Sequence, residues 1–384
     1  MTIAQLVQSL REEGVGRDSS LLSAAWQRRE RVLDKVANVQ LVMGEDGARA
    51  IALKPSDLEE GELVSRPLSD NFSRFVRLPE SFRQAFLQQQ VKDFLYETFC
   101  LGDRSFGDAA IAANNELSGG IHSELLNRLI ASNYGQGYFD AGWQVVEDLG
   151  EELAVMKQGV VIYVEKHRHL QDEDALMNWD AVSIRLPEYR FEPGFYVAVG
   201  DAGPVVSTPS IEFYMAAEAS AVTVVLEAVT KSFNAVGEAI PYTLRLPYQL
   251  GGYRAQATGA ETVALRTVES AGDRAVIVLE EIVRACSCLS AIAPEDLVDW
   301  DKPALRPDCS IFAYPIFPGV SMAVADSDAD WFGGWADRSC CEALAQVLVA
   351  HWTEADKDRD CHQQLLKSRL TSALELRGFG WQLP

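Results

Sequence analysis

The sequence has few basic residues relative to acidic ones, no cysteines spaced as C-x-x-C and no apolar run of membrane-spanning length. The missing C-x-x-C pairs remove the usual ligand spacing of structural zinc sites. The missing apolar run argues against a membrane-spanning helix, and the first residues lack the basic-then-apolar order of a secretory signal. We therefore predict a cytoplasmic protein whose seven cysteines are reduced thiols.

The charge balance restricts the partners. Thirty-four basic residues stand against 56 acidic ones, which gives a formal net charge of −22. A general nucleic-acid binder needs a basic surface that displaces counterions from phosphates, and adhesion to anionic lipid needs one too. We predict no nucleic-acid partner and no membrane partner.

The length of 384 residues predicts a main domain and a smaller N-terminal region. We expect the boundary near residue 135, with a mainly helical region at 1–135 that recognises a peptide or a partner and an α+β domain at 136–384. Apolar residues at helical spacing, a hairpin pattern around Gly44 and Gly47, and a polar linker define the N-terminal region. The expected helices are 2–13, 19–36, 79–100 and 121–134, the hairpin is 39–53, and the linker is 54–71.

Short β-branched runs dominate the sequence after Gly142, and helical patterns separate or follow them. Strands that cluster in this way favour an α+β fold over a doubly wound sheet, so we predict a mixed or antiparallel sheet flanked by helices. The expected strands are 160–164, 181–186, 195–199, 211–215 and 261–265. The expected helices are 218–236, 268–290, 338–351 and 358–377.

Four ordered segments resemble the Hop-A type III effector-like family. RLPEYRFEPGFYVAVGDAGP (185–204) is similar to an R-L-P element followed by P-G-F-Y and a G-D turn. The segment 211–246 resembles a strand, a helix that ends in Asn and an I-P-aromatic strand, and 317–345 resembles a P-G-V turn, an acidic loop and a helix. Upstream, 142–164 is similar to a strand that ends in Lys-x-Gly. The resemblance covers about 210 residues and implies the α+β fold.

The resemblance also implies a reaction and its partners. Members of the family are phosphothreonine and phosphoserine lyases of ribosomal peptide natural-product (RiPP) pathways, such as lanthipeptide biosynthesis. A phosphotransferase-like kinase phosphorylates a precursor peptide, and the lyase eliminates phosphate to leave a dehydroamino acid, without a cofactor. The matching positions give Lys157 as the base, Tyr253 as an acid or orienting hydroxyl, and Arg185, Arg245 and Arg338 as phosphate ligands.

Each of these residues also has a purely structural interpretation. Lys157 is also typical of a turn at a strand end, and Arg185 of a surface ion pair. Arg245 lies between two leucines, so it faces either solvent or a cleft, and Tyr253 is also typical of core packing. The family carries Lys at the position of Arg245. A non-catalytic protein that holds a kinase and its peptide, or an effector acting on a host target, therefore stays an alternative.

Two further groups of residues suggest sites, and a structural interpretation is favoured for both. The cysteines at 286, 288, 340 and 341, with histidines downstream, suggest zinc. Adjacent and alternate cysteines more often pack as small hydrophobic residues, so we predict no metal. The basic run 166–169 is followed at once by acidic residues and is typical of a solvated loop.

Overall fold

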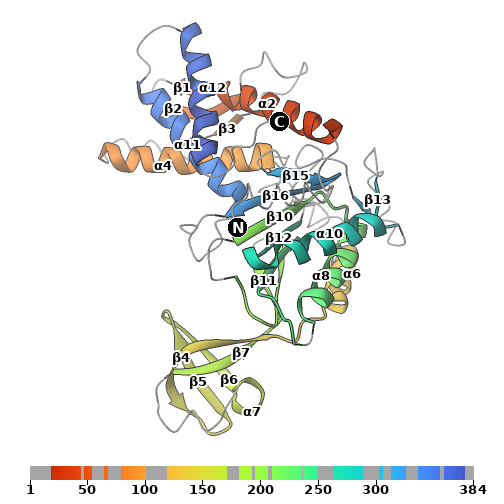
Figure 1. The fold of residues 1–384 in the computed structure, drawn as a ribbon. Helices are drawn as coiled ribbons and strands as arrows, with labels where there is room; N and C mark the ends of the chain where they lie inside the picture. The colour runs from red at the N-terminus through yellow and green to blue at the C-terminus, as the bar shows by residue number, and fades with distance from the viewer. Residues whose placement is uncertain are drawn as a thin grey trace.

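In the computed structural model the protein is α+β, which confirms the predicted fold class (Figure 1). The described residues form antiparallel sheets of seven, four and three strands and a parallel pair of short strands. The structure describes residues 19–44, 47–53, 65–67, 79–100, 119–170, 181–192, 195–205, 210–235, 237–248, 263–288, 302–305, 313–325, 336–354 and 359–376.

The seven-stranded sheet is the centre of the fold. Its strand order, β15-β16-β10-β12-β11-β9-β8, brings the last strands of the chain next to β10. Every pairing in it is antiparallel. The strands are β8 (Tyr189–Glu192), β9 (Phe195–Val199), β10 (Ser210–Met215), β11 (Tyr242–Pro247), β12 (Val263–Val268), β15 (Tyr314–Phe317) and β16 (Val320–Ala325).

One face of this sheet packs on α6, α8 and α10. The helix α8 presents Val222, Val225, Leu226 and Val229 at the spacing of an apolar helical stripe, and all four side chains are buried. They form one hydrophobic core with the alternate residues of β9 to β12. The bounds are α6 (Gly119–Ser132), η5 (Ala219–Ala221), α8 (Val222–Phe233), η6 (Glu269–Ala271) and α10 (Gly272–Ala285).

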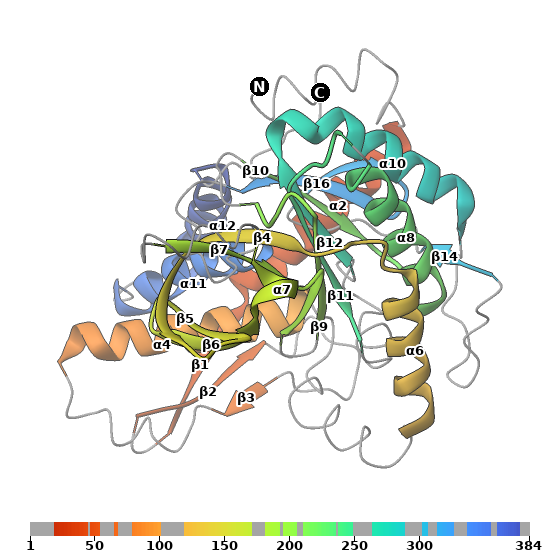
Figure 2. The ribbon, with the colours of Figure 1, turned by 90° about the horizontal axis from the view of Figure 1, so that it is seen from below.

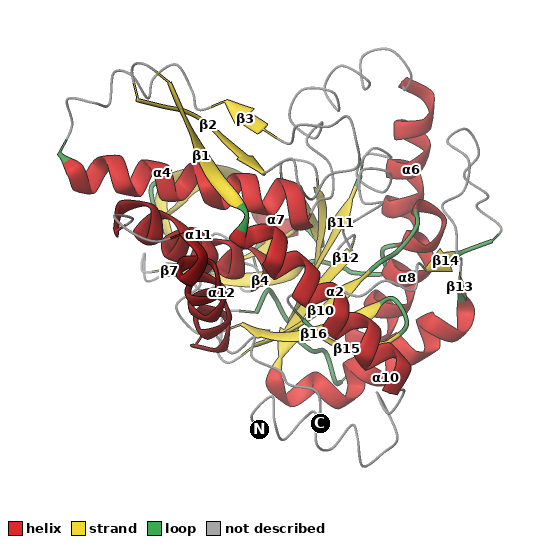
Figure 3. Cartoon of the chain, turned by 90° about the horizontal axis from the view of Figure 1, so that it is seen from above, coloured by secondary structure: helices red, strands yellow, loops and turns green. Residues whose placement is uncertain are grey.

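A second core joins the two ends of the described chain. Leu33 of α2 and Val91 of α4 are buried together with Leu344 of α11 and Leu370 of α12. Figure 3 shows α4, α11 and α12 on one side of the strands and α6 and α8 on the other. The N-terminal region thus shares a core with the C-terminal helices, and its role in recognition stays a prediction. The bounds are α2 (Ser19–Ala37), α4 (Glu80–Leu95), η2 (Tyr96–Cys100), α11 (Ala336–Glu354) and α12 (Arg359–Leu376).

The N-terminal region also carries the three-stranded sheet. β1 (Val39–Gly44) and β2 (Gly47–Leu53) form the predicted hairpin, with Gly44 opposite Gly47. β3 (Ser65–Pro67) pairs with β2, so the prediction of a linker over 54–71 is wrong at these three residues. Polar composition does not exclude a strand where a neighbouring edge offers backbone hydrogen bonds. The predicted helix at 2–13 lies outside the described residues.

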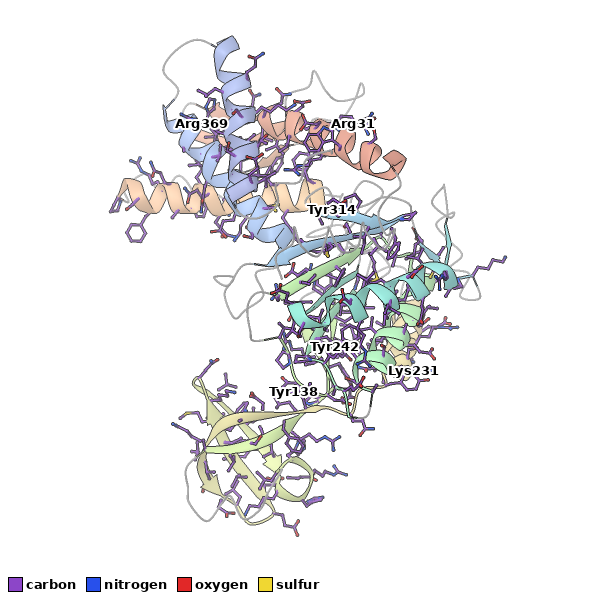
Figure 4. All side chains as sticks on the ribbon, in the orientation of Figure 1. Arg31, Tyr138, Lys231, Tyr242, Tyr314 and Arg369 are labelled. Carbon is purple, nitrogen blue, oxygen red and sulfur yellow. The ribbon has the colours of Figure 1, made fainter. Side chains whose placement is uncertain are left out.

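The four-stranded sheet projects from the rest of the protein (Figure 1). Seen from below, it curves around the short helix α7 (Figure 2). Tyr138, the first residue of this sheet, is paired with Leu186, its last residue. The chain therefore enters and leaves the sheet at one end, where Figure 4 labels Tyr138. Its own small core contains Trp143 and Val155. The strands, in the order β6-β5-β4-β7, are β4 (Tyr138–Asp148), β5 (Glu152–Lys157), β6 (Val160–Glu165) and β7 (Ala181–Leu186), and α7 is Lys166–His169.

The remaining described strands, β13 (Ser287–Cys288) and β14 (Ala304–Leu305), form the parallel pair. None of the helices in the described part of the chain is both long and apolar enough to cross a membrane.

Candidate functional site

Charged residues gather on the face of the seven-stranded sheet opposite α8 and α10. Strand alternation sends Phe213, Leu244 and Leu265 into the core under these helices. The residues beside them in sequence therefore point to the opposite face. Four of these residues, Glu212, Tyr214, Arg245 and Arg266, form what we call the sheet-face cluster.

Glu212 is the centre of this cluster. It lies directly opposite Arg266 in the pairing of β10 and β12, and its carboxylate is completely buried. Arg266 donates from both Nε, at 2.7 Å, and Nη2 to Oε1 of Glu212. The hydroxyl of Tyr214 donates to the other carboxylate oxygen, Oε2. Both oxygens of the buried carboxylate are thus hydrogen-bonded, as a charge in a low-dielectric interior requires.

Arg245 belongs to β11, which lies beside the central strand β12, and is only 5% exposed. Its guanidinium carbon lies 4.5 Å from the ring centroid of Phe195, in cation–π contact. Thr243 is opposite Arg266 and Arg245 is opposite Ala264. Arg245 and Arg266 are therefore diagonal neighbours on one face, a relation in which Cβ atoms lie roughly 7 Å apart.

This arrangement is suited to an anion. The sheet-face cluster brings two guanidinium groups to one face of the sheet within a protein of net charge −22. A guanidinium keeps its charge at every physiological pH and offers a planar fork to phosphate oxygens. Burial strengthens such contacts because water does not screen them.

The sequence interpretation found Arg245 and missed Arg266, Glu212 and Tyr214. The signal was present in the strand patterns IEFYM and ALRTV, where a charged residue alternates with apolar ones. Alternation alone allows such a residue to face solvent or a buried site, so the pairing of β10 with β12 was needed to separate the two.

Lys157 lies in the four-stranded sheet, at the end of β5. Its ammonium donates to both carboxylate oxygens of Asp140, at 2.7 and 2.8 Å, and to the carbonyl oxygen of Ala141 at 2.8 Å. The indole of Trp143 donates to the same carboxylate at 2.7 Å. Asp140 and Trp143 flank an irregularity in the pairing of β4 with β7, where Gly142 has a φ of +86°. Lys157 therefore holds this bulge.

Arg185 lies on the other face of the same four-stranded sheet. It is opposite Phe139, whereas Asp140 is opposite Ile184 of the small core. The Arg185 guanidinium donates to the carbonyl oxygen of Gln136, in the segment that leads into β4. The structure thus does not bring Lys157 and Arg185 to one face, and Arg245 belongs to another sheet.

Beside Arg185, the segment before β4 meets the residues after β9, and we call this place the junction between the two larger sheets. The junction contains the carboxylate of Asp201. The Oδ1 atom of Asp201 accepts from the backbone N–H of Gln136 at 2.7 Å. Partial burial raises the pKa of Asp201 above its usual value, although the Gln136 N–H and the Arg185 charge oppose the shift. Arg185 therefore acts on this junction electrostatically.

Two tyrosines and two asparagines complete the junction. Asn133 donates to the hydroxyl of Tyr196 at 2.8 Å, and Asn234 donates to that of Tyr242 at 3.2 Å. Asn234 also accepts from the backbone N–H of Asp201 at 2.9 Å. Burial raises the pKa of both tyrosine hydroxyls, so these groups stay protonated at neutral pH.

The other candidate residues lie partly outside the described structure. Tyr253 is not among the described residues. Arg338 lies in the first turn of α11, but its side chain is not described. Within the described part of the chain, no group of three or more His, Cys, Asp or Glu side chains could hold a metal ion. Cys340 and Cys341 of α11 form no disulfide and are buried in the second core.

Two solved bacterial effectors have a weakly similar structure. One is the effector protein from Pseudomonas syringae pv. tomato strain DC3000. The alignment covers 77% of this chain and 92% of the effector chain, with 14% sequence identity and a TM-score of 0.34. The other is the effector protein from Pseudomonas syringae pv. syringae strain 61. The alignment covers 79% of this chain and 96% of the effector chain, with 12% sequence identity and a TM-score of 0.36. No family model and no curated protein matches the chain. At these TM-scores the likeness adds no evidence on function.

Proposed function

We propose that this protein is a lyase that eliminates phosphate from phosphoserine or phosphothreonine in a precursor peptide. The observation that carries the proposal is the pair of arginines, Arg245 and Arg266, that share one face of the central sheet. Arg245 is 5% exposed, and the side chain of Arg266 is 16% exposed. Two guanidinium groups on one face offer planar sets of donors to phosphate oxygens, and burial strengthens such contacts, which supports a phosphoryl group as the ligand.

The proposed reaction needs a base, an anion site and no cofactor. The base removes the α-proton, the electron pair forms the Cα–Cβ double bond, and the Cβ–O bond breaks to release phosphate. Arg245 and Arg266 stabilise the charge that gathers on the leaving phosphate. Lys157 remains the proposed base, Tyr253 the proposed acid, and Arg185 and Arg338 further proposed phosphate ligands.

Lys157 suits this role only in a rearranged site. Its Nζ atom donates to both carboxylate oxygens of Asp140 and to the carbonyl oxygen of Ala141, so these groups occupy it in place of a substrate. Binding of the peptide must therefore separate Lys157 from Asp140 before elimination. A Lys157→Ala protein that still eliminates phosphate at the wild-type rate would refute the assignment of Lys157.

The proposal is tested with a peptide that contains one phosphothreonine, made directly or with a separate kinase. The protein should cause a mass loss equal to phosphoric acid, and the product should add a thiol at the new double bond. An unphosphorylated peptide is the control. The absence of mass loss with every phosphopeptide from a cognate kinase would reject the lyase.

A second candidate function is favoured by the Lys157–Asp140 ion pair. A lysine that holds a bulge in β4 leaves the protein without that base, and the sheet-face cluster could then bind a phosphopeptide without changing it. Such a protein would hold the peptide for its kinase, or act as an effector on a host phosphoprotein. Stable capture of a phosphopeptide, with no change in its mass, would support this function over the lyase.

A further inference from the structure

The two edge strands of the four-stranded sheet, β6 and β7, differ in what lies beside them. At β7, Leu170 forms a β-bridge with Ile184, and the Nδ1 atom of His169 donates to the carbonyl oxygen of Arg185 at 2.7 Å. At β6, no strand or bridge in the described part of the chain pairs on the side away from β5. The β6 edge is therefore the place where a further strand can join this sheet.

β6 lacks the features that protect exposed edges from pairing. Natural edge strands carry lysine or proline, or are interrupted by bulges. β6 has the sequence VVIYVE, and all six of its residues pair with β5 in unbroken register. Its Val160, Val161 and Tyr163 are exposed, Tyr163 by 65%. Since every second residue of such a strand turns its backbone N–H and C=O groups outward, this edge offers hydrogen bonds and apolar contact to an added strand.

The outer face beside this edge is acidic around an exposed ring. Val164 points into the small core, so strand alternation directs Tyr163 and Glu165 to the opposite, outer face. Glu152 of β5 lies directly opposite Glu165. Glu147 of β4 lies in the same row as Tyr163, two strands away. The ring of Tyr163 thus shares the outer face with three carboxylates.

The cations near β6 are already paired, whereas several carboxylates are not. Each Lys or Arg in or directly after β5 and β6 has an acidic partner, and the ion pairs are Lys157–Asp140, Lys166–Asp148 and Arg168–Glu165. Among the described residues, Glu147, Glu151 and Glu152 take part in no ion pair. The field at this face is therefore negative and attracts a basic partner. A second copy would bring the same carboxylates and a net charge of −22, which disfavours self-pairing.

We propose that β6 binds an extended, basic segment of a partner polypeptide, which joins the four-stranded sheet as a fifth strand. Basic side chains at alternate positions of the segment lie on the outer face, where one stacks on the ring of Tyr163 and another faces Glu165. The side chains between them lie beside Ile162 and Val164, so apolar residues suit these positions. Backbone hydrogen bonds to β6 supply affinity, and the alternate side chains supply specificity. The inference is independent of the proposed elimination, because it involves neither phosphate nor the sheet-face cluster.

The test uses a short fluorescent peptide of alternating Lys and Val, and anisotropy measures its binding to the full-length protein. The wild type should bind this peptide, and added salt should weaken binding because it screens exposed charges. A peptide with Glu in place of Lys should not bind. A peptide of the same composition with its lysines grouped at one end should bind more weakly, because it lacks the alternation. The bound peptide should slow amide hydrogen exchange in β6 and leave β8, an edge strand of the other sheet, unchanged.

A variant of the exposed ring tests the centre of the surface. Tyr163→Ser removes the ring and should weaken binding about fivefold, since it removes the cation–π contact and its apolar area. The control is Phe82→Ser, which removes a ring of α4 that is 63% exposed, close to the exposure of Tyr163. Phe82→Ser should bind the peptide as the wild type does.

A variant of the carboxylates tests the charge of the surface. Glu147→Gln/Glu152→Gln removes two exposed negative charges from the outer face and should weaken binding about fivefold at low salt. The control Glu124→Gln/Glu280→Gln makes the same change in net charge on α6 and α10, where Glu280 forms an exposed ion pair with Arg284. This control should bind the peptide as the wild type does.

Each outcome supports or overturns the proposal. Absence of binding by the wild type overturns it, and so does binding that leaves amide exchange in β6 unchanged. Unweakened binding by Tyr163→Ser and by the double carboxylate variant assigns the peptide to another surface and also overturns it. If Tyr163→Ser does not fold, the carboxylate variant still decides. A wild-type dimer in sedimentation that Tyr163→Ser does not form would assign the edge to a second copy and overturn the choice of a basic partner. Elimination is measured with a different, phosphorylated peptide, so failure of the lyase and failure of this docking surface are distinguishable.

Discussion

The two larger sheets use their cations in different ways. In the four-stranded sheet, Lys157 and Arg185 bind neighbouring groups of their own region, Asp140, Ala141 and Gln136, and these contacts explain their positions. In the seven-stranded sheet, Arg245 is buried over an aromatic ring, and Arg266 forms an ion pair with a completely buried carboxylate. A basic residue that fits a family position is thus weak evidence for a site, and its local contacts separate structural cations from candidate ligands.

The largest expected effect concerns the buried ion pair. Glu212→Ala leaves the Arg266 charge and the Tyr214 hydroxyl without their buried partner, so we expect the free energy of unfolding to fall by about 3–5 kcal/mol. The matched change in the exposed ion pair, Glu280→Ala, should cost about 0.5 kcal/mol or less. Urea denaturation of both variants measures the difference. Equal costs would show that the burial of Glu212 does not distinguish the two environments.

The next effect separates the two sheets by phosphate binding. Arg245→Met keeps an unbranched apolar side chain over Phe195 but removes the cation, so we expect affinity for a phosphopeptide to fall by about 10–100-fold with the fold retained. Arg185→Met should lower it less, because Arg185 bonds to Gln136. Fluorescence anisotropy with a labelled phosphopeptide measures both. An equal loss in Arg185→Met would extend the phosphate site to the four-stranded sheet and break the comparison.

A smaller effect is expected for the bulge in β4. Lys157→Met removes the donor to Asp140 and Ala141, and we expect about 1–2 kcal/mol lower stability in this sheet. The control is Arg128→Met, which removes an exposed ion pair on α6 at a cost of about 0.5 kcal/mol or less. Amide hydrogen exchange should quicken in β4 and β5 of the first variant. Unchanged amide exchange in β4 and β5 would show that Lys157 does not stabilise this sheet.

Strands with strong alternation could be predicted from the sequence, and their order in the sheet could not. The pattern IEFYM predicted β10 to within one residue, because its apolar positions repeat with the period of a strand. The predicted strand 261–265 ends too early, because β12 continues to Val268, and residues 261–262 lie outside the described residues. Strand order depends on long-range packing, and no local pattern indicates that β16 lies beside β10.

The same limit applies to the candidate site. Arg245 could be found because its flanking leucines and the family resemblance both point to that strand. Arg266 and Glu212 are far apart in sequence and become partners only through the register of β12 with β10. The shared core of α2 with α12 was equally invisible, because each helix shows an apolar stripe without indicating what covers it.

The smallest expected effect concerns the junction between the two sheets. Burial raises the pKa of Asp201 in the folded protein, so the folded state binds this proton more tightly than the unfolded state does. Its contribution to stability is greatest below the unfolded pKa and declines as the pH rises to the folded pKa. Asp201→Asn keeps an oxygen for the Gln136 N–H and removes the buried charge. The variant should therefore gain stability relative to the wild type as the pH rises through this window.

Arg185 provides the matched test of that carboxylate. Its positive charge lowers the Asp201 pKa, so Arg185→Met should raise this pKa further and shift the pH window upward. Carbon-detected NMR titration of the Asp201 carboxyl measures the pKa in both proteins. An unchanged pKa in Arg185→Met would show that Arg185 does not act on the junction. Arg185 could then no longer be assigned a structural role in its own sheet. Phosphate binding would become the better explanation of its position.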